Sequence, residues 1–127
     1  MTLLEGYRPS DLSAEAVQAT RGPLLLIFGI DACGHCRAAQ PAIEAALRAH
    51  PGVAVRQIED GPGRRLGRAF RVKLWPTLVC LSDGREVARV VRPREARPVA
   101  EGLAAIDVAV ARAPAGPAAP SGAQDQT

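Results

Sequence analysis

The chain has 127 residues and a formal net charge of +3, with 47% hydrophobic but only 3% aromatic residues. This length suits one small domain whose single core must be filled by aliphatic side chains. Three cysteines are too few for a disulfide framework, and the N-terminus lacks the charged and apolar regions of a secretory signal. No apolar run approaches the ~20 residues of a membrane-spanning helix, and the scattered arginines lack interleaved aromatic residues. We therefore expect a soluble, cytoplasmic protein that binds neither membranes nor nucleic acid.

The first third of the chain predicts an irregular lead-in with a short edge strand (residues 1–9), then one helix and one buried strand. Ser10 or Asp11 can cap a helix that extends to about Thr20, because both side chains accept hydrogen bonds from free helical N–H groups. Residues 24–28 are apolar without alternation, which is typical of a strand that is covered on both faces. The rough apolar stripe of the helix consists of Leu12, Ala16, Val17 and Ala19.

The middle of the chain predicts a long helix, a strand and a short helix. The long helix runs from about Cys33 to Ala49, and Pro41 inside it should kink it by removing a backbone hydrogen bond. Residues 53–58 predict the strand, and residues 64–70 predict the short helix. The expected core positions of the two helices are Ile43, Ala46 and Leu47, then Leu66, Ala69 and Phe70.

The last part of the chain predicts a β-hairpin and a closing helix. Residues 77–81 are nearly all apolar, a turn signal follows, and residues 86–91 return as the partner strand. The helix begins between Pro93 and Pro98 and ends near Arg112. Its expected core positions are Val99, Leu103, Ile106, Val108 and Val110.

The order of these elements favours an α/β domain over residues 1–112, with a mixed central sheet and helices on both faces. Residues 113–127 consist largely of Ala, Pro and Gly without periodicity and predict a disordered C-terminal tail.

Cys33 and Cys36 carry the most specific chemistry in the sequence. Three residues apart on a helical turn, they are close enough to bridge, and a helix N-terminus favours the thiolate form. In a reducing compartment such a pair is more often catalytic or metal-binding than a structural staple. Zinc would need four ligands, and the remaining candidates, Cys80, His35 and His50, lie at unpromising places. We therefore expect a redox pair without a metal, and Cys80 as an inert core residue.

Three motifs occur together: Ala-Cys-Gly-His-Cys at residues 32–36, Pro41 five residues later, and Trp-Pro-Thr at residues 75–77. In this combination the chain resembles the thioredoxin family over roughly residues 11–111. The resemblance implies a thioredoxin-like fold, thiol–disulfide exchange, and a cis peptide bond before Pro76.

Three positions depart from the family pattern. The Trp that usually precedes the first cysteine is Ala32, and the Pro between the cysteines is His35, as in the Cys-Gly-His-Cys sites of protein disulfide isomerases. The buried acid usually found six residues before the first cysteine is Ile27. Because that acid is thought to assist proton transfer at the buried cysteine, its replacement bears on the rate of the resolving step and on the direction of electron flow.

Thiol chemistry and the resemblance assign roles to the residues of the pair. Cys33 is expected to attack the substrate disulfide, and Cys36 to resolve the mixed disulfide that forms. Gly34 and His35 are expected to tune the pair, since a positive imidazole would stabilise the Cys33 thiolate.

The second motif is expected to bind substrate. Pro76 would hold the loop opposite the cysteines and leave the Trp75 backbone free to pair with an extended substrate strand. Thr77 belongs to the same loop. The Trp75 ring would offer an apolar contact surface, or would simply pack on the fold.

The expected function is a cofactor-free, monomeric thiol–disulfide oxidoreductase that reduces disulfide-containing protein substrates and is recharged by a disulfide reductase. Two alternatives stay open: a disulfide oxidant or isomerase, and a non-catalytic thioredoxin-like adaptor.

Overall fold

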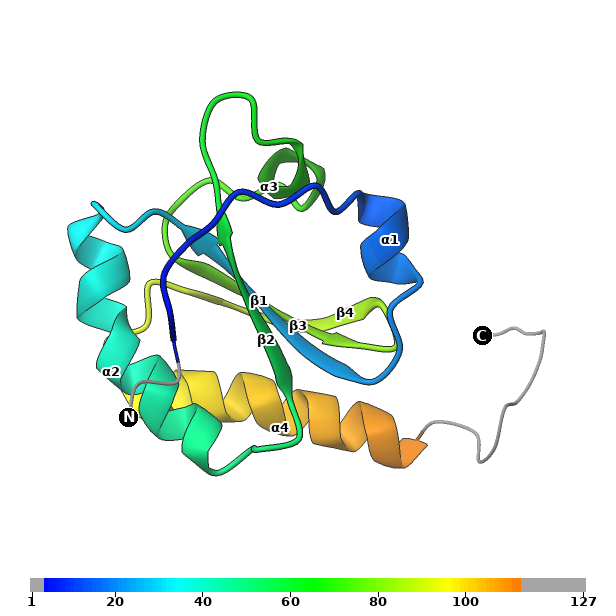
Figure 1. The fold of residues 1–127 in the computed structure, drawn as a ribbon. Coiled ribbons are helices and arrows are strands. Elements are labelled where there is room, and N and C mark those ends of the chain that lie inside the picture. The colour runs from blue at the N-terminus through cyan, green and yellow to red at the C-terminus, as the bar shows by residue number, and fades with distance from the viewer. Residues whose placement is uncertain (1–3, 113–127) are drawn as a thin grey trace.

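The structure, a computed structural model, describes residues 4–112 and has a four-stranded sheet at its centre (Figure 1). The strands lie in the order β2-β1-β3-β4, with β1 parallel to β2 and antiparallel to β3, and β3 antiparallel to β4. The predicted mixed sheet is confirmed. The predicted tail, residues 113–127, lies outside the described residues. The strand bounds are β1 Pro23–Gly29, β2 Ala54–Glu59, β3 Thr77–Ser82 and β4 Arg85–Val91.

Helices cover both faces of the sheet, α2 and α4 on one and α1 and α3 on the other (Figure 1). Successive β1 side chains point to opposite faces. Leu25 and Ile27 therefore pack against α2 and α4, while Leu24, Leu26 and Phe28 pack against α1 and α3. This arrangement explains the unbroken apolar run of β1, as predicted. The helix bounds are α1 Ala14–Gln18, α2 Gly34–Arg48, α3 Arg65–Ala69 and α4 Ala96–Arg112. No described helix is long and apolar enough to cross a membrane.

The segment before α1 lies along the outer edge of β2. Arg8 forms an isolated parallel bridge with Ile58. Its carbonyl accepts a hydrogen bond from the Glu59 N–H at 2.8 Å, and its own N–H donates to the Gln57 carbonyl at 3.4 Å. The expected edge strand is thus a single bridge, but it fixes this segment against the sheet.

The first helix is shorter than predicted. Residues 10–12 are not helical, and Ser13 is the N-cap, its hydroxyl accepting a hydrogen bond from the Ala16 N–H at 3.0 Å. A helix of five residues meets the sheet with one side chain, so Val17 is buried while Ala16 and Ala19 are exposed. The predicted cap was wrong, and so were two of the four predicted stripe positions; Leu12 precedes the helix but packs, partly buried, against the same core cluster as Val17.

Three other predicted core positions are exposed. Ala69 lies on the outer side of α3, whose short length again leaves a single large side chain, Leu66, in the core. In α4, Val108 and Val110 are 50% and 48% exposed. Val108 follows the buried Ile106 by two residues, about 200° around the helix, so it leaves the buried stripe. Val110 lies in the last turn, beyond the final buried residue of that stripe.

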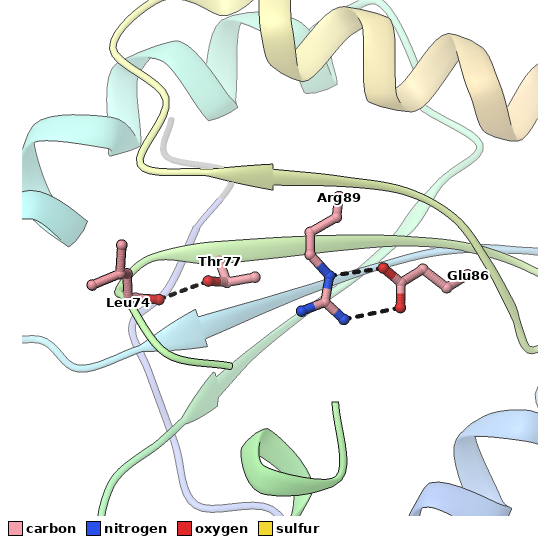
Figure 2. Close-up of polar contacts among 4 residues, drawn as sticks. All are labelled: Leu74, Thr77, Glu86 and Arg89. Atoms are coloured by element: carbon pink, nitrogen blue, oxygen red, sulfur yellow. Dashed lines mark hydrogen bonds and ion pairs between the residues drawn. The ribbon is translucent and has the colours of Figure 1, made fainter. Parts of the chain in front are cut away.

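The hairpin between β3 and β4 contains a bulge. Leu81 pairs with Glu86 and Cys80 with Ala88, which leaves one extra residue in β4. Residues three apart on a regular strand face opposite sides, but the extra residue brings Glu86 and Arg89 to the same side. The Arg89 guanidinium donates to both carboxylate oxygens of Glu86, at 2.7 and 2.9 Å (Figure 2).

Candidate active site

The cysteine pair lies where β1 ends and α2 begins. Cys33 is the N-cap of α2, with extended backbone and no capping hydrogen bond from its side chain, so its sulfur stays available beside the free helical N–H groups. Cys36 lies in the first turn and is 3% exposed, whereas Cys33 is half-buried. Both are free thiols. The helix therefore presents one accessible sulfur and one covered sulfur.

The environment of Cys33 favours its thiolate. Burial alone would raise the pKa of the Cys33 thiol, but hydrogen bonds from the backbone and thiol of Cys36 outweigh it. A backbone hydrogen bond from His35 and the positive charge of Arg92 act in the same direction. The pKa of Cys33 consequently lies below the ordinary value of a thiol.

The environment of Cys36 favours its protonated form. Burial raises the pKa of the Cys36 thiol to about 11, and the hydrogen bond with Cys33 and the charge of Cys33 add to this effect. Hydrogen bonds from the Ile30 backbone and from the Tyr7 hydroxyl lower it in part. The pKa values of two neighbouring thiols in one helical turn are thus shifted in opposite directions.

The loop that carries Trp75 and Pro76 is held from two sides. The peptide bond between them is cis, as the resemblance implied. The Thr77 hydroxyl donates to the Leu74 carbonyl at 2.6 Å (Figure 2). The Trp75 indole N–H donates to an Asp60 carboxylate oxygen at 2.8 Å. The Trp75 residue is half-buried and its indole is held by Asp60. Of the two roles considered for the ring, this favours packing on the fold over a free contact surface.

Arg92 connects this loop to the cysteine pair. Its backbone N–H donates to the Pro76 carbonyl at 2.9 Å and its Nε donates to the Trp75 carbonyl at 2.8 Å. The Trp75 carbonyl thus already accepts one hydrogen bond, and pairing of the Trp75 backbone with a substrate strand stays a prediction. Arg92 adopts φ +50°, a left-handed backbone that non-glycine residues rarely adopt. Its charge also lowers the pKa of Cys33, so this one residue contacts the loop and acts electrostatically on the cysteine pair.

The remaining predicted residues lie around the pair. Gly34 and His35 are exposed, and electrostatic tuning through the His35 imidazole stays a prediction. Asp31 accepts the Tyr7 backbone N–H at 2.9 Å and so holds the N-terminal segment. His50 Nδ1 lies 3.3 Å from Asp107 Oδ2.

Cys80 is buried in β3, as expected for a core residue, and burial raises the pKa of its thiol to about 11. Among the described residues, no three His, Cys, Asp or Glu side chains are grouped as a metal site would require.

Two residues of the site were missed in the sequence. Tyr7 and Arg92 are far from the cysteines along the chain, and neither belongs to a local motif. The available signal was weak: the chain contains a single tyrosine, and Arg92 directly follows a predicted strand.

Residues 10–105 match the thioredoxin family. The chain belongs to this family. The thioredoxin of Chlamydia pneumoniae is 34% identical over 70 residues, which cover 55% of this chain and 69% of that protein. The structure of thioredoxin 2 from Pseudomonas aeruginosa PAO1 in its reduced form is 47% identical, with a TM-score of 0.74, and covers 82% of this chain and 97% of that one. A mutant thioredoxin from Halobacterium salinarum is 27% identical with a TM-score of 0.60, covering 75% and 83%.

Membership in the thioredoxin family confirms the predicted fold and the predicted class of activity. The protein is a thiol–disulfide oxidoreductase with a Cys-x-x-Cys pair, and Cys33 and Cys36 supply that spacing. Thioredoxins act on disulfide substrates and are recharged by a reductase.

Proposed function

We propose that this thioredoxin reduces protein disulfides in the cytoplasm as a monomer, with Cys33 as the attacking thiolate and Cys36 as the resolving thiol. The observation that carries the proposal is that the two neighbouring thiols have pKa values shifted in opposite directions. The pKa of Cys33 lies below the ordinary value of a thiol, and that of Cys36 is raised to about 11. The more accessible thiolate attacks first, and the covered thiol then attacks the mixed disulfide.

The reaction proceeds in two exchanges. The Cys33 thiolate attacks one sulfur of the substrate disulfide, and the other substrate sulfur leaves as a thiolate that takes up a proton. Cys36 then loses its proton to solvent and attacks the Cys33 sulfur. The Cys33–Cys36 bond forms as the bond to substrate breaks, and the second substrate sulfur leaves. Two electrons pass from the protein to the substrate, and a disulfide reductase returns them.

Substrate is proposed to lie along the loop that contains Pro76. Leu74 and Val91 flank this loop and are each 47% exposed, so they offer apolar contact surface on either side. The Arg92 side chain holds the Trp75 carbonyl, which leaves the Trp75 N–H as the group for pairing with an extended substrate strand.

An oxidant or isomerase is the second candidate. Interactions that stabilise the Cys33 thiolate stabilise the reduced protein, and a more stable reduced form makes the disulfide a stronger oxidant. Hydrogen bonds from two backbone groups and the charge of Arg92 all act in this direction.

The reduction potential of the Cys33–Cys36 pair tests the proposal. The protein is equilibrated in thiol–disulfide buffers, and the oxidised fraction is measured by alkylation and mass. A potential near about −270 mV supports a reductase, whereas a value near about −180 mV supports the oxidant or isomerase.

Two variants accompany this titration. Cys33→Ser should abolish disulfide reduction, and Cys80→Ala, which removes the core thiol, should not. An adaptor would keep its partner binding and its biological role in the Cys33→Ser variant.

A further inference from the structure

A chain of hydrogen bonds leads from the N-terminal segment to the buried thiol. The Gly6 N–H donates to Gln57 Oε1 at 2.9 Å. This bond leaves the amide nitrogen of Gln57, a donor, for its hydrogen bond with the Tyr7 hydroxyl. Because Tyr7 accepts from Gln57, its own proton is free for the hydrogen bond with Cys36.

Gly29 makes room for this contact. A Cβ at residue 29 would lie 2.5 Å from Cys36 Sγ and 3.0 Å from Tyr7 Cζ. Real Cβ atoms essentially never come within 3.0 Å of another atom, so the approach to Cys36 Sγ would force a shift, and the approach to Tyr7 Cζ would be tight. The missing side chain at the end of β1 is therefore what lets the thiol and the phenol meet.

The backbone that carries the phenol is also held in place before any substrate binds. The Tyr7 backbone N–H donates to Asp31 Oδ1 at 2.9 Å, and the next residue, Arg8, forms the bridge with β2. A donor held in place needs no reorganisation when charge develops on its partner.

The position where the resemblance implied an acid offers no such group. Ile27 is completely buried in the core and has no ionisable side chain. The side chains with the largest effects on the pKa of Cys36 are Cys33, on its own helix, and Tyr7, from the N-terminal segment. Asp31, which faces this segment, accepts the backbone of Tyr7.

We propose that Tyr7 takes part in the resolving step: its hydroxyl donates a hydrogen bond to Cys36 Sγ as the thiolate forms, and Gln57 orients that hydroxyl. The inference rests on the function proposed above. Tyr7 keeps its proton throughout. The proton of Cys36 passes to solvent. The departing substrate sulfur leaves with the electron pair of the broken S–S bond and takes up a different proton from solvent. The hydroxyl thus supplies at Cys36 the stabilisation that Ile27 cannot.

A symmetric aromatic disulfide, dithiobis(nitrobenzoate), separates the two steps. Attack by Cys33 releases one coloured thiolate, and attack by Cys36 on the mixed disulfide releases the second. Tyr7→Phe should slow the second release about tenfold or more, because a hydrogen bond to a charged group is lost. It should also move the pH profile of this release to higher pH and leave the first release unchanged.

The matched control is Ser82→Ala, which removes another buried hydroxyl, at the end of β3. It should leave both releases unchanged. Equal rates and equal pH profiles for the second release in Tyr7→Phe and the unmodified chain would overturn the proposal. Failure of the proposed function would appear in the unmodified chain itself, as a missing second release and no Cys33–Cys36 disulfide by mass.

A second measurement does not depend on the folding of Tyr7→Phe. The chain has one tyrosine, so biosynthetic incorporation of fluorotyrosine alters Tyr7 alone. A fluorinated phenol is more acidic and a stronger donor, so the second release should shift to lower pH, opposite to Tyr7→Phe. An unshifted profile would show that the ring only fills space.

Discussion

Arg92 shows how one residue can serve a site at a cost to the backbone. A left-handed conformation costs a non-glycine residue roughly 1–2 kcal/mol, and Arg92 adopts it at φ +50°. The conformation lets its N–H reach the Pro76 carbonyl and its Nε reach the Trp75 carbonyl. These two hydrogen bonds, each worth about 1 kcal/mol, offset the cost. The positive charge is then held where it acts on Cys33.

The Arg92 charge can be tested by neutralising it. Arg92→Gln should raise the pKa of Cys33, because the charge that favours the thiolate is removed. The pH dependence of Cys33 alkylation by iodoacetamide reports this pKa, and at neutral pH the variant should react more slowly.

Arg94→Gln is the control for that variant. Arg94 is exposed and lies two residues further along, so the same change in net charge should leave the alkylation profile in place. Equal shifts in both variants would mean that only the overall charge matters.

At the scale of elements, α4 packs on the sheet through a glycine. A Cβ at Gly102 would lie 2.9 Å from Cys80 Sγ on β3 and 3.2 Å from Val90 Cγ2 on β4. Glycine in a helix interior normally costs about 0.5–1 kcal/mol relative to alanine. Here the absent side chain allows the helix to approach the strands closely.

Replacing a helical glycine by alanine usually stabilises a protein, but this close approach predicts the opposite at Gly102. Gly102→Ala should destabilise the protein by about 1–3 kcal/mol through overpacking, measured as the free energy of unfolding in urea. In the Cys80→Ala background the sulfur is gone, and the same substitution should cost clearly less. Additive effects of the two substitutions would contradict this account of the contact.

The elements that the sequence predicted well are those whose signal is local. The apolar run of β1, the residue pattern of the hairpin and the spacing of the cysteines each lie within a few residues. The start of α1 was predicted wrongly at Ser10 or Asp11, because Ser and Asp are both favourable N-cap residues wherever they occur and the actual cap, Ser13, is of the same type. The choice of Ser13 follows from the attachment of the preceding segment to β2, a contact between distant parts of the chain.

The sequence predicted the site residues that belong to local motifs, and it missed those that come from distant parts of the chain. Tyr7 and Gln57 are 50 residues apart in the sequence and meet at Cys36 only because a segment without regular structure follows the edge of β2. Arg92 was visible as one of several scattered arginines, and only its backbone angle and its two carbonyl partners distinguish it. Propensity and spacing carry no information on such contacts.

At the scale of the whole molecule, the buried thiols make stability depend on pH. Burial raises the pKa values of Cys36 and Cys80 from an ordinary 9.0 to about 11. Between these values the unfolded chain releases protons that the folded chain retains. Stability contributed by the neutral thiols is therefore complete below pH 9 and is lost as the pH rises towards 11.

Redox state should change this dependence. In the reduced protein the free energy of unfolding should fall between pH 9 and 11, with each buried thiol contributing at most about 1.4 kcal/mol per pH unit. The oxidised protein should show a shallower slope, because Cys36 then has no proton to lose. Urea unfolding of both forms across this range measures the difference.

The Cys80→Ala variant separates the two thiols. It should reduce the slope in both redox states and leave the difference between them intact. Parallel slopes for the oxidised and reduced forms of the unmodified protein would show that Cys36 does not contribute.

The attachment of residues 6–8 to β2 also bears on where this protein can be cut. The family match begins at residue 10, three residues after the phenol that contacts Cys36. A chain that begins at residue 10 would keep both cysteines and the loop around Pro76, and its Cys33 would still attack substrate disulfides and form mixed disulfides. Without Tyr7, attack of Cys36 on the mixed disulfide would be slow, and so would release of the substrate. The trimmed chain would therefore act as a covalent trap that retains its partners.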